Sequence, residues 1–224
     1  MATPTAPPVG GTARTQVEPF VERLVDWVKA HRQATTWIGA ALGVGLVLFL
    51  WTLSSTRRSE AIADRQLQGA RYAFDNQNLP LAASELSRII ENYAGTNAAS
   101  ESRLLLAQTR LLQGQPQQAI EVLRDFAPRA GSSYKAQAYG LLGAAYENLG
   151  RTRDAAEAYQ TAAEHARLDF FEAQLLSDAG RAWTAAGDTV KAVAAYRRIV
   201  QELPKTGPVT EAKVRLGELT KGTP

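Results

Sequence analysis

The sequence predicts an all-α protein, in which a single N-terminal transmembrane helix precedes an α-solenoid of about four helix pairs and a capping helix. Two observations lead to this prediction. No side chain from Gln33 to Thr56 carries a charge, and this stretch is long enough to cross a bilayer. After Arg58 the chain is rich in alanine, and its small and large apolar residues recur every 36 or 37 residues. A fixed period of this length is typical of stacked helical repeats.

Two segments are expected before the uncharged stretch. Residues 1–15 are rich in proline, glycine and threonine, which predicts a disordered tail. In residues 16–33, which contain "VEPFVERLVDWVKAHR", apolar side chains recur at helical spacing. We therefore expect an amphipathic helix beside the membrane. Its acidic and basic residues balance, so it lacks the basic excess that attracts a helix to anionic lipid.

Residues 35–54 form the predicted transmembrane helix. At a rise of 1.5 Å per residue this segment spans about 30 Å, which is the hydrocarbon thickness of a bilayer. Trp37 and Trp51 lie near its two ends, where tryptophan prefers the headgroup region. A cleaved signal peptide has a shorter apolar stretch, a shorter leader and a better cleavage site, so we expect a retained anchor. The spacing of Gly39 and Gly43 suits close contact with another membrane helix.

The charges beside this helix do not predict its orientation. Four cations lie within about 20 residues on either side: Arg14, Arg23, Lys29 and Arg32 before it, and Arg57, Arg58, Arg65 and Arg71 after it. Cytoplasmic segments carry an excess of lysine and arginine. Because the two sides are equal here, this rule leaves both orientations open.

Composition excludes several classes of protein. The chain has no cysteine, so disulfide frameworks, thiolate metal sites and cysteine nucleophiles are excluded. After the predicted membrane helix, 21 lysine and arginine residues face 19 aspartate and glutamate residues. These charges alternate in sign along the chain, whereas nucleic-acid binding requires a clustered basic face. We therefore expect no nucleic-acid partner.

The repeat is defined by small residues at fixed positions. Five of them recur at intervals of 37, 36, 37 and 37 residues: Ala70, Ala107, Gly143, Gly180 and Gly217. Sixteen residues after each of the first four stands a large apolar residue: Leu86, Leu123, Tyr159 and Tyr196. Small residues allow two helices to cross closely, and the large residue fills the gap to the next pair. We expect a domain over 57–220, with repeats at about 63–96, 100–133, 136–169 and 173–206 and a capping helix over 208–220.

In these features the chain resembles the tetratricopeptide repeat family. The segments "YGLLGAAYENLGRTRDAAEAYQTAAEHA" and "LSDAGRAWTAAGDTVKAVAAYRRIVQELP" match the family pattern closely. The second repeat matches less well, and the first lacks the glycine that ends the first helix. The resemblance implies a stack of helix pairs whose first helices line a groove that binds proteins.

The same resemblance implies which side chains face this groove. Family positions carried onto the chain give a set of candidate partner-binding residues: Arg71, Phe74, Gln108, Leu112, Gln137, Ala144, Asn148 and Arg181. This set lacks the cationic clamp by which some relatives hold the carboxylates of a peptide, and it suits apolar or partly unfolded segments. The alternative is that several groove positions belong to the core, Leu104 and Leu111 above all.

The sequence offers no catalytic or metal site. Its two histidines, His31 and His165, are far apart, and no metalloprotease, nucleophile-elbow or phosphate-loop motif is present. We therefore expect that the protein is not an enzyme and has no catalytic residues, metal ligands, cofactor or small-molecule substrate.

The complete layout also resembles a narrower family, the membrane-anchored tetratricopeptide proteins that accompany the bacterial Sec translocon. A short tail, the stretch "VEPFVERLVDWVKAHRQATTWIGAALGVG", one anchor and four repeats carry this resemblance. It implies a single-pass protein of the bacterial inner membrane, with a cytoplasmic N-terminus and periplasmic repeats, that acts as an ancillary subunit and chaperone. Its partners would be translocon subunits, exported chains or periplasmic chaperones.

Two alternatives to this interpretation stay open. The repeats could serve as a structural scaffold of another envelope complex, in division, envelope biogenesis or secretion. They could also lie in the cytoplasm, since the flanking charges do not fix the orientation.

Overall fold

The structure is a computed structural model that describes residues 27 and 30–221. The tail expected over 1–15 and most of the amphipathic helix expected over 16–33 lie outside the described residues. The chain divides into two compact units, Met1–Ser55 and Thr56–Pro224.

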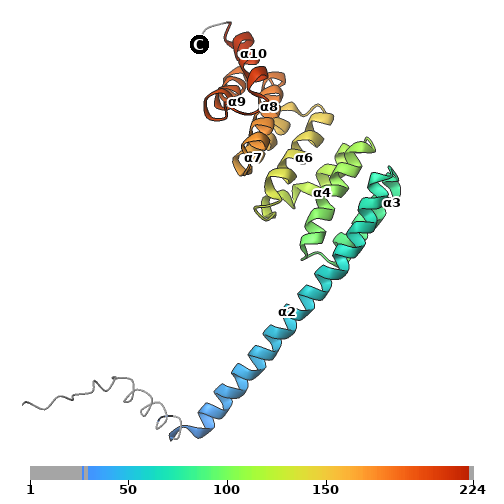
Figure 1. Cartoon of the computed structure of the whole chain (residues 1–224), viewed down its shortest axis with the longest axis vertical. Coiled ribbons are helices and arrows are strands. Elements are labelled where there is room, and N and C mark those ends of the chain that lie inside the picture. The colour runs from blue at the N-terminus through green and yellow to red at the C-terminus, as the bar shows by residue number, and fades with distance from the viewer. Residues whose placement is uncertain (1–26, 28–29, 222–224) are drawn as a thin grey trace, which may run out of the picture. The chain divides into compact units, whose positions relative to one another are not determined.

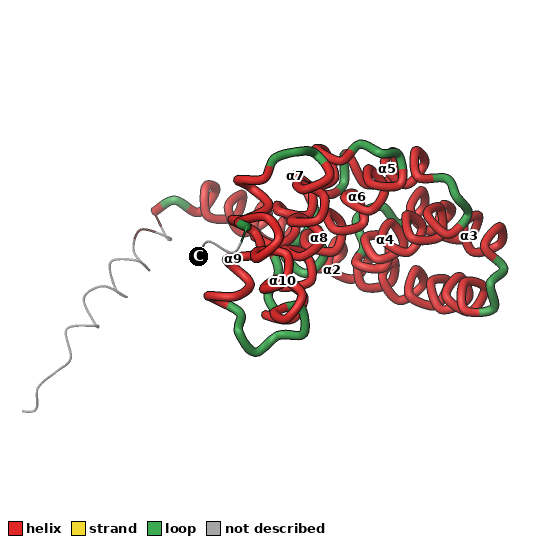
Figure 2. The backbone as a smooth tube through the Cα atoms, turned by 90° about the horizontal axis from the view of Figure 1, so that it is seen from above, coloured by secondary structure: helices red, strands yellow, loops and turns green. Residues whose placement is uncertain are grey.

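Every regular element in the described residues is helical (Figure 2). The helices are α2 (Arg32–Asp75), α3 (Leu79–Asn92), α4 (Asn97–Leu112), α5 (Pro116–Arg124), η1 (Ala127–Arg129), α6 (Lys135–Asn148), α7 (Thr152–His165), α8 (Asp169–Ala185), α9 (Thr189–Glu202) and α10 (Val209–Thr220).

The second unit is a solenoid of helix pairs. Helices α3 to α10 follow one another across it in chain order (Figure 1), and each packs mainly against its neighbours in the sequence. The end of α2 pairs with α3, since both contribute to one apolar cluster. The later pairs are α4 with α5, α6 with α7 and α8 with α9, before the single helix α10. The predicted all-helical, solenoid-like architecture is confirmed.

The uncharged stretch lies within α2, the longest described helix. Large apolar side chains are exposed along it, including Trp37 at 77%, Phe49 at 60% and Trp51 at 68% of their surface. Even so, no described helix combines the length and the apolar character needed to cross a membrane. The membrane-spanning helix expected over residues 35–54 is therefore not found in the described residues.

The core of the solenoid depends on pairing small residues with large ones. A Cβ atom on Gly143 would lie 2.7 Å from Cδ1 of Tyr159, and one on Gly180 would lie 2.6 Å from Cζ of Tyr196. Real Cβ atoms essentially never approach a neighbour so closely, so each ring occupies the space that glycine leaves open.

In the first two pairs, alanine and leucine stand at the positions that glycine and tyrosine occupy in the later pairs. Ala70 and Leu86 are fully buried in one apolar cluster, and Ala107 and Leu123 are fully buried in another. A larger residue on the first helix thus accompanies a smaller one on the second. Close packing requires such complementary volumes, because protein interiors leave few voids.

The turn inside each pair keeps one geometry even where its glycine is missing. Gly114, Gly150 and Gly187 adopt left-handed conformations with φ between 70° and 78°, and Gln77 adopts φ 60° at the equivalent position. The same backbone hydrogen bond closes these turns, as in Asn78 N–H to the carbonyl of Ala73 at 2.9 Å. Gln77 bears a steric cost of about 1 kcal/mol that glycine avoids.

Glu60 joins the first pair to the second. Its two carboxylate oxygens accept the backbone N–H groups of Asn97 and Ala98, each at 3.0 Å, in the first turn of α4. The side chain of Thr96 accepts the N–H of Ala99 at 3.0 Å. Three of the amides that a helix start leaves without a partner are thereby satisfied.

Helix α10 ends the array with a polar outer face. Thirty-seven residues after Leu176, Gly180 and Trp183 of α8 stand Lys213, Gly217 and Thr220. Ala212 is buried against the preceding pair, whereas a Cβ on Gly217 would meet nothing within 4 Å. One face of α10 therefore covers the core and the other faces solvent, as a terminal repeat requires.

The pairing of small and large residues generates a testable prediction. We expect Gly180→Ala to lower the free energy of unfolding by about 1–3 kcal/mol, because the added methyl group meets the Tyr196 ring. Adding Tyr196→Leu should recover part of this loss, since the first two pairs combine alanine with leucine. Urea denaturation of the purified full-length chain measures both effects.

The matched control is Gly217→Ala, which has open space around its new Cβ. Alanine is a better helix former than glycine, so this variant should lose no stability. If Gly180→Ala is as stable as the parent chain, the packing of the Tyr196 ring does not require glycine at position 180.

Candidate partner-binding groove

The first helices of three pairs form a cavity of about 270 Å³, which we call the first-helix groove. Its lining comes from α2, α4, the residue before α6, and α6 itself: Arg71, Phe74, Asp75, Glu101, Leu104, Leu105, Gln108, Tyr134 and Gln137. The second helices α3, α5 and α7 contribute nothing to the lining.

Four candidates from the sequence come together in this groove: Arg71, Phe74, Gln108 and Gln137. Leu104 also borders it but is only 3% exposed, so the alternative that it belongs to the core is correct for most of its surface. Sequence reasoning did not single out Tyr134, because it immediately precedes α6 and lies outside the expected repeat.

The other candidates do not line the groove. Leu112 is 60% exposed at the end of α4, and Asn148 is exposed at the end of α6. Ala144 is partly buried against the apolar core formed by α7, α8 and α9. Of the two glycines proposed for membrane-helix contact, Gly43 has open space around it, and the side-chain surroundings of Gly39 lie outside the described residues.

An ion pair crosses the groove. The guanidinium of Arg71 on α2 donates a hydrogen bond to the carboxylate of Glu101 on α4. Both side chains are more than a third exposed, so solvent screening limits the contribution of this pair to stability. The pair matters for binding, because Arg71 is the only cation among the described residues that line the groove and its charge is already paired with Glu101.

A second network joins α6, α7 and α8 through Glu147. The phenolic O–H of Tyr159 donates to one Glu147 oxygen at 2.9 Å, and Arg181 donates to the other. Arg181 also donates to Asp178 at 2.8 Å. Burial, followed by the charge of Glu147 and this hydrogen bond, raises the pKa of Tyr159 well above its usual value. The guanidinium of Arg181, the eighth candidate, is therefore already paired with two carboxylates of this chain.

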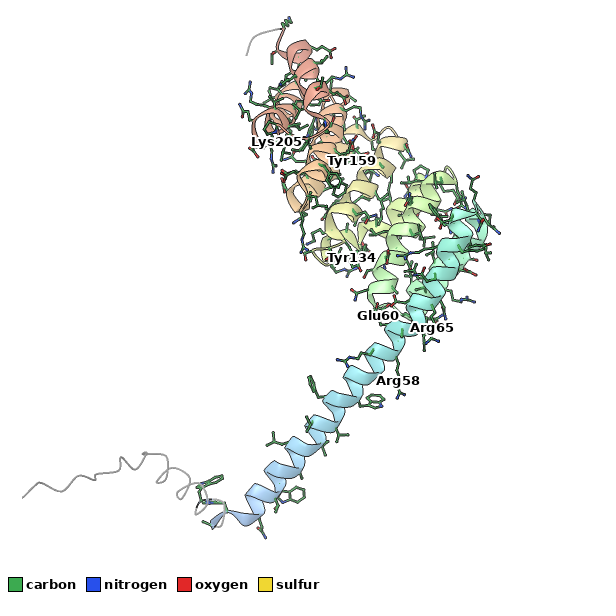
Figure 3. The ribbon with its side chains drawn as sticks, in the orientation of Figure 1. Arg58, Glu60, Arg65, Tyr134, Tyr159 and Lys205 are labelled. Carbon is green, nitrogen blue, oxygen red and sulfur yellow. The ribbon has the colours of Figure 1, made fainter. Side chains whose placement is uncertain are left out.

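Carboxylates gather at one end of the first-helix groove. The pKa of Tyr134 is raised first by burial and then by the charges of Glu101, Glu60 and Asp64. Figure 3 shows Tyr134 at the same end of the helix stack as Glu60. Three carboxylates from two helices therefore act on one side chain at the edge of the groove.

A separate cavity of about 470 Å³ lies between α7, α8 and α9. Leu176 and Trp183 line it, and Trp183 is 1% exposed. The indole N–H of Trp183 donates to Gln160 at 3.3 Å, and the ammonium of Lys191 lies 4.0 Å from the ring centroid. The sequence analysis did not predict this cavity, which the small residues Ala194 and Ala195 of α9 also line.

In the part of the chain that the structure describes, no three histidine, cysteine, aspartate or glutamate side chains are arranged to hold a metal ion. His165 stacks on Tyr139, with 6.4 Å between the ring centroids. The ring Nδ1 of His31 lies 3.1 Å from the carbonyl oxygen of Trp27.

Comparison with known proteins places the helix pairs in a family. Residues 53–170, which are more than half of the chain, match the model of the tetratricopeptide repeat-like domain. No curated protein matches the chain.

Solved structures with the same fold are distant in sequence. The crystal structure of MamA is 22% identical, with a TM-score of 0.56, over 68% of this chain and 83% of that one. A putative kinesin light chain of Podosopora anserina with nearly identical TPR-like repeats is 20% identical, with a TM-score of 0.57, over 73% and 87%. A variant form of that protein is 19% identical, with a TM-score of 0.58, over the same shares. At such identities the likeness concerns the fold alone.

The environment of Tyr159 generates a prediction about pH. Because folding raises the pKa of this phenol, its contribution to stability is complete below the unfolded value of about 10 and is lost as the pH rises beyond it. We expect Tyr159→Phe to cost about 1 kcal/mol at pH 7, through the lost hydrogen bond to Glu147. The deficit should shrink as the pH rises above about 10. Urea denaturation across this range measures it, and a constant deficit would contradict the assignment.

Proposed function

Because the chain belongs to the tetratricopeptide repeat-like domain family, we propose that it is a membrane-anchored protein-binding module whose first-helix groove holds a segment of a partner protein. The observation that carries this proposal is the groove itself. Phe74, Leu104 and Leu105 are its apolar lining, which we call the apolar floor, and the other six lining side chains are polar or charged. Binding sites commonly combine an apolar floor with a few polar groups that fix the orientation of the ligand.

The anchor in this proposal is the stretch from residue 35 to residue 54. It carries no charge and is helical, and its described large apolar side chains, such as Trp37 and Trp51, are exposed. Exposed apolar side chains in such number mark a surface that contacts lipid or another protein. The two tryptophans stand near the ends of the stretch, as expected for headgroup contact.

The cellular setting in this proposal comes from the resemblance in layout. The chain would be a single-pass protein of the bacterial inner membrane, with a cytoplasmic N-terminus and periplasmic repeats. It would assist exported proteins as an ancillary subunit and chaperone of the Sec translocon. Its partners would be translocon subunits, exported chains or periplasmic chaperones.

Site-specific photo-crosslinking tests the groove. A photoreactive residue at Phe74, which lines the groove, should trap translocon subunits or exported chains in living cells. The matched control is Glu164, an exposed residue of the second helix α7, which should trap far less. Recovery of neither class of partner from position 74 would refute the proposed setting. Recovery of one fixed complex, with export unaffected by deletion of the protein, would support the scaffold alternative.

Reporter fusions after Thr220 test the anchor and the orientation. Alkaline phosphatase requires disulfide bonds and is active only outside the reducing cytoplasm, so this fusion should be active. A matched fusion that lacks residues 35–54 should be inactive and should leave the membrane fraction. Activity of a cytoplasmic reporter at the same position would reverse the proposed orientation.

A further inference from the structure

The charge of the first-helix groove is opposite to that of the domain. After the uncharged stretch the chain carries a net charge of +2. The groove is lined by two carboxylates, Asp75 and Glu101, and by one cation, Arg71. Asp64 lies about two helical turns before Arg71 and therefore on the same side of α2. The groove and its edge thus concentrate negative charge on a domain whose total charge is positive.

Arg71, the only cation among the described residues that line the groove, is paired with Glu101. In contrast, no ion pair within the described residues involves Asp64 or Asp75. A partner that enters the groove therefore meets the carboxylate of Asp75, which forms no described ion pair, and a guanidinium that is already paired.

Two further observations locate the negative field. Glu60 is engaged with the start of α4, yet its charge still contributes to the raised pKa of Tyr134, together with Glu101 and Asp64. In Figure 3 Arg65 lies on the side of α2 away from Glu60.

The apolar lining residues determine which uncharged side chain the groove can accept beside a cation. Phe74 and Leu105 are partly buried and line the groove beside Asp75 and Glu101. An apolar side chain can therefore rest on the floor while a neighbouring cation reaches the carboxylates. A metal ion alone does not fit this description, because the described carboxylates form no metal-binding group.

We propose that the first-helix groove recognises a polypeptide segment in which a lysine or arginine stands next to an apolar residue. The cation faces Asp75, which lines the groove, and the apolar side chain packs on Phe74. Asp64, about three helical turns earlier on the same side of α2, adds negative charge along the path of the segment. Charge complementarity carries this choice of partner, since it favours cations and rejects acidic segments through like-charge repulsion. This inference rests on the proposed function, in which the groove binds a protein, and it adds the chemistry of the bound segment.

Three labelled peptides test the inference against the full-length chain in mild detergent. They repeat the units Leu-Lys-Ser, Leu-Gln-Ser and Leu-Glu-Ser four times and differ only in charge. Fluorescence anisotropy should show that the lysine peptide binds at least about tenfold more tightly than the other two. Its affinity should fall as salt is added, because the carboxylates are exposed to solvent.

Variants separate the groove from the rest of the surface. Asp64→Asn combined with Asp75→Asn should weaken the lysine peptide by at least about fivefold. The control variant, Glu157→Gln combined with Glu164→Gln, removes two exposed carboxylates from α7 and should leave the affinity for the lysine peptide unchanged. Asp64→Lys combined with Asp75→Lys should make the glutamate peptide the preferred ligand. Circular dichroism checks that each variant stays folded.

The outcomes distinguish this inference from the proposed function. Equal binding of the three peptides would overturn the charge preference and leave the groove as a protein-binding site. Unchanged binding by the Asp64 and Asp75 variants would also overturn it. If no peptide binds, the inference fails, and crosslinking from position 74 then decides whether the proposed function fails as well.

Discussion

The contact between a small residue on each first helix and a large apolar residue on the next helix sets the geometry of the solenoid. Where glycine stands at 143 and 180, tyrosine rings at 159 and 196 occupy the space above the backbone. The contact also has a polar consequence. By seating the ring of Tyr159 on Gly143, it brings the phenolic O–H to Glu147, which in turn holds Arg181. Packing between helices thus determines which charges on the first-helix side are already paired.

Much of the fold could be predicted because small and large apolar residues recur at fixed intervals along the chain. The intervals of 36 and 37 residues indicated stacked pairs, and the segment "EAKVRLGELT" indicated a final helix over 208–220. The missing glycine of the first repeat did not change its turn, because Gln77 adopts the same left-handed conformation. Local patterns of this kind survive in a single sequence. The membrane-spanning helix expected over residues 35–54, in contrast, is not found in the described residues.

The groove was less accessible from the sequence, since its chemistry depends on contacts between distant residues. Family positions brought Arg71, Phe74, Gln108 and Gln137 to one cavity, yet they did not show that Glu101 neutralises Arg71. The capping of α4 by Glu60 joins residues 37 and 38 positions apart and has no local signature. The same holds for the cavity beside Trp183, which arises where three helices leave space between them.

The last helix has a consequence for how such a protein can lengthen. Gly217 keeps the spacing of the earlier small residues but has no ring above it. The chain thus keeps the small residue on which a further helix could pack. Lys213 and Thr220 stand where α8 has Leu176 and Trp183, so this surface lacks the apolar side chains that would bind another helix. A repeat added after α10 would need apolar side chains at these two positions to continue the core, and the earlier pairs would stay unchanged.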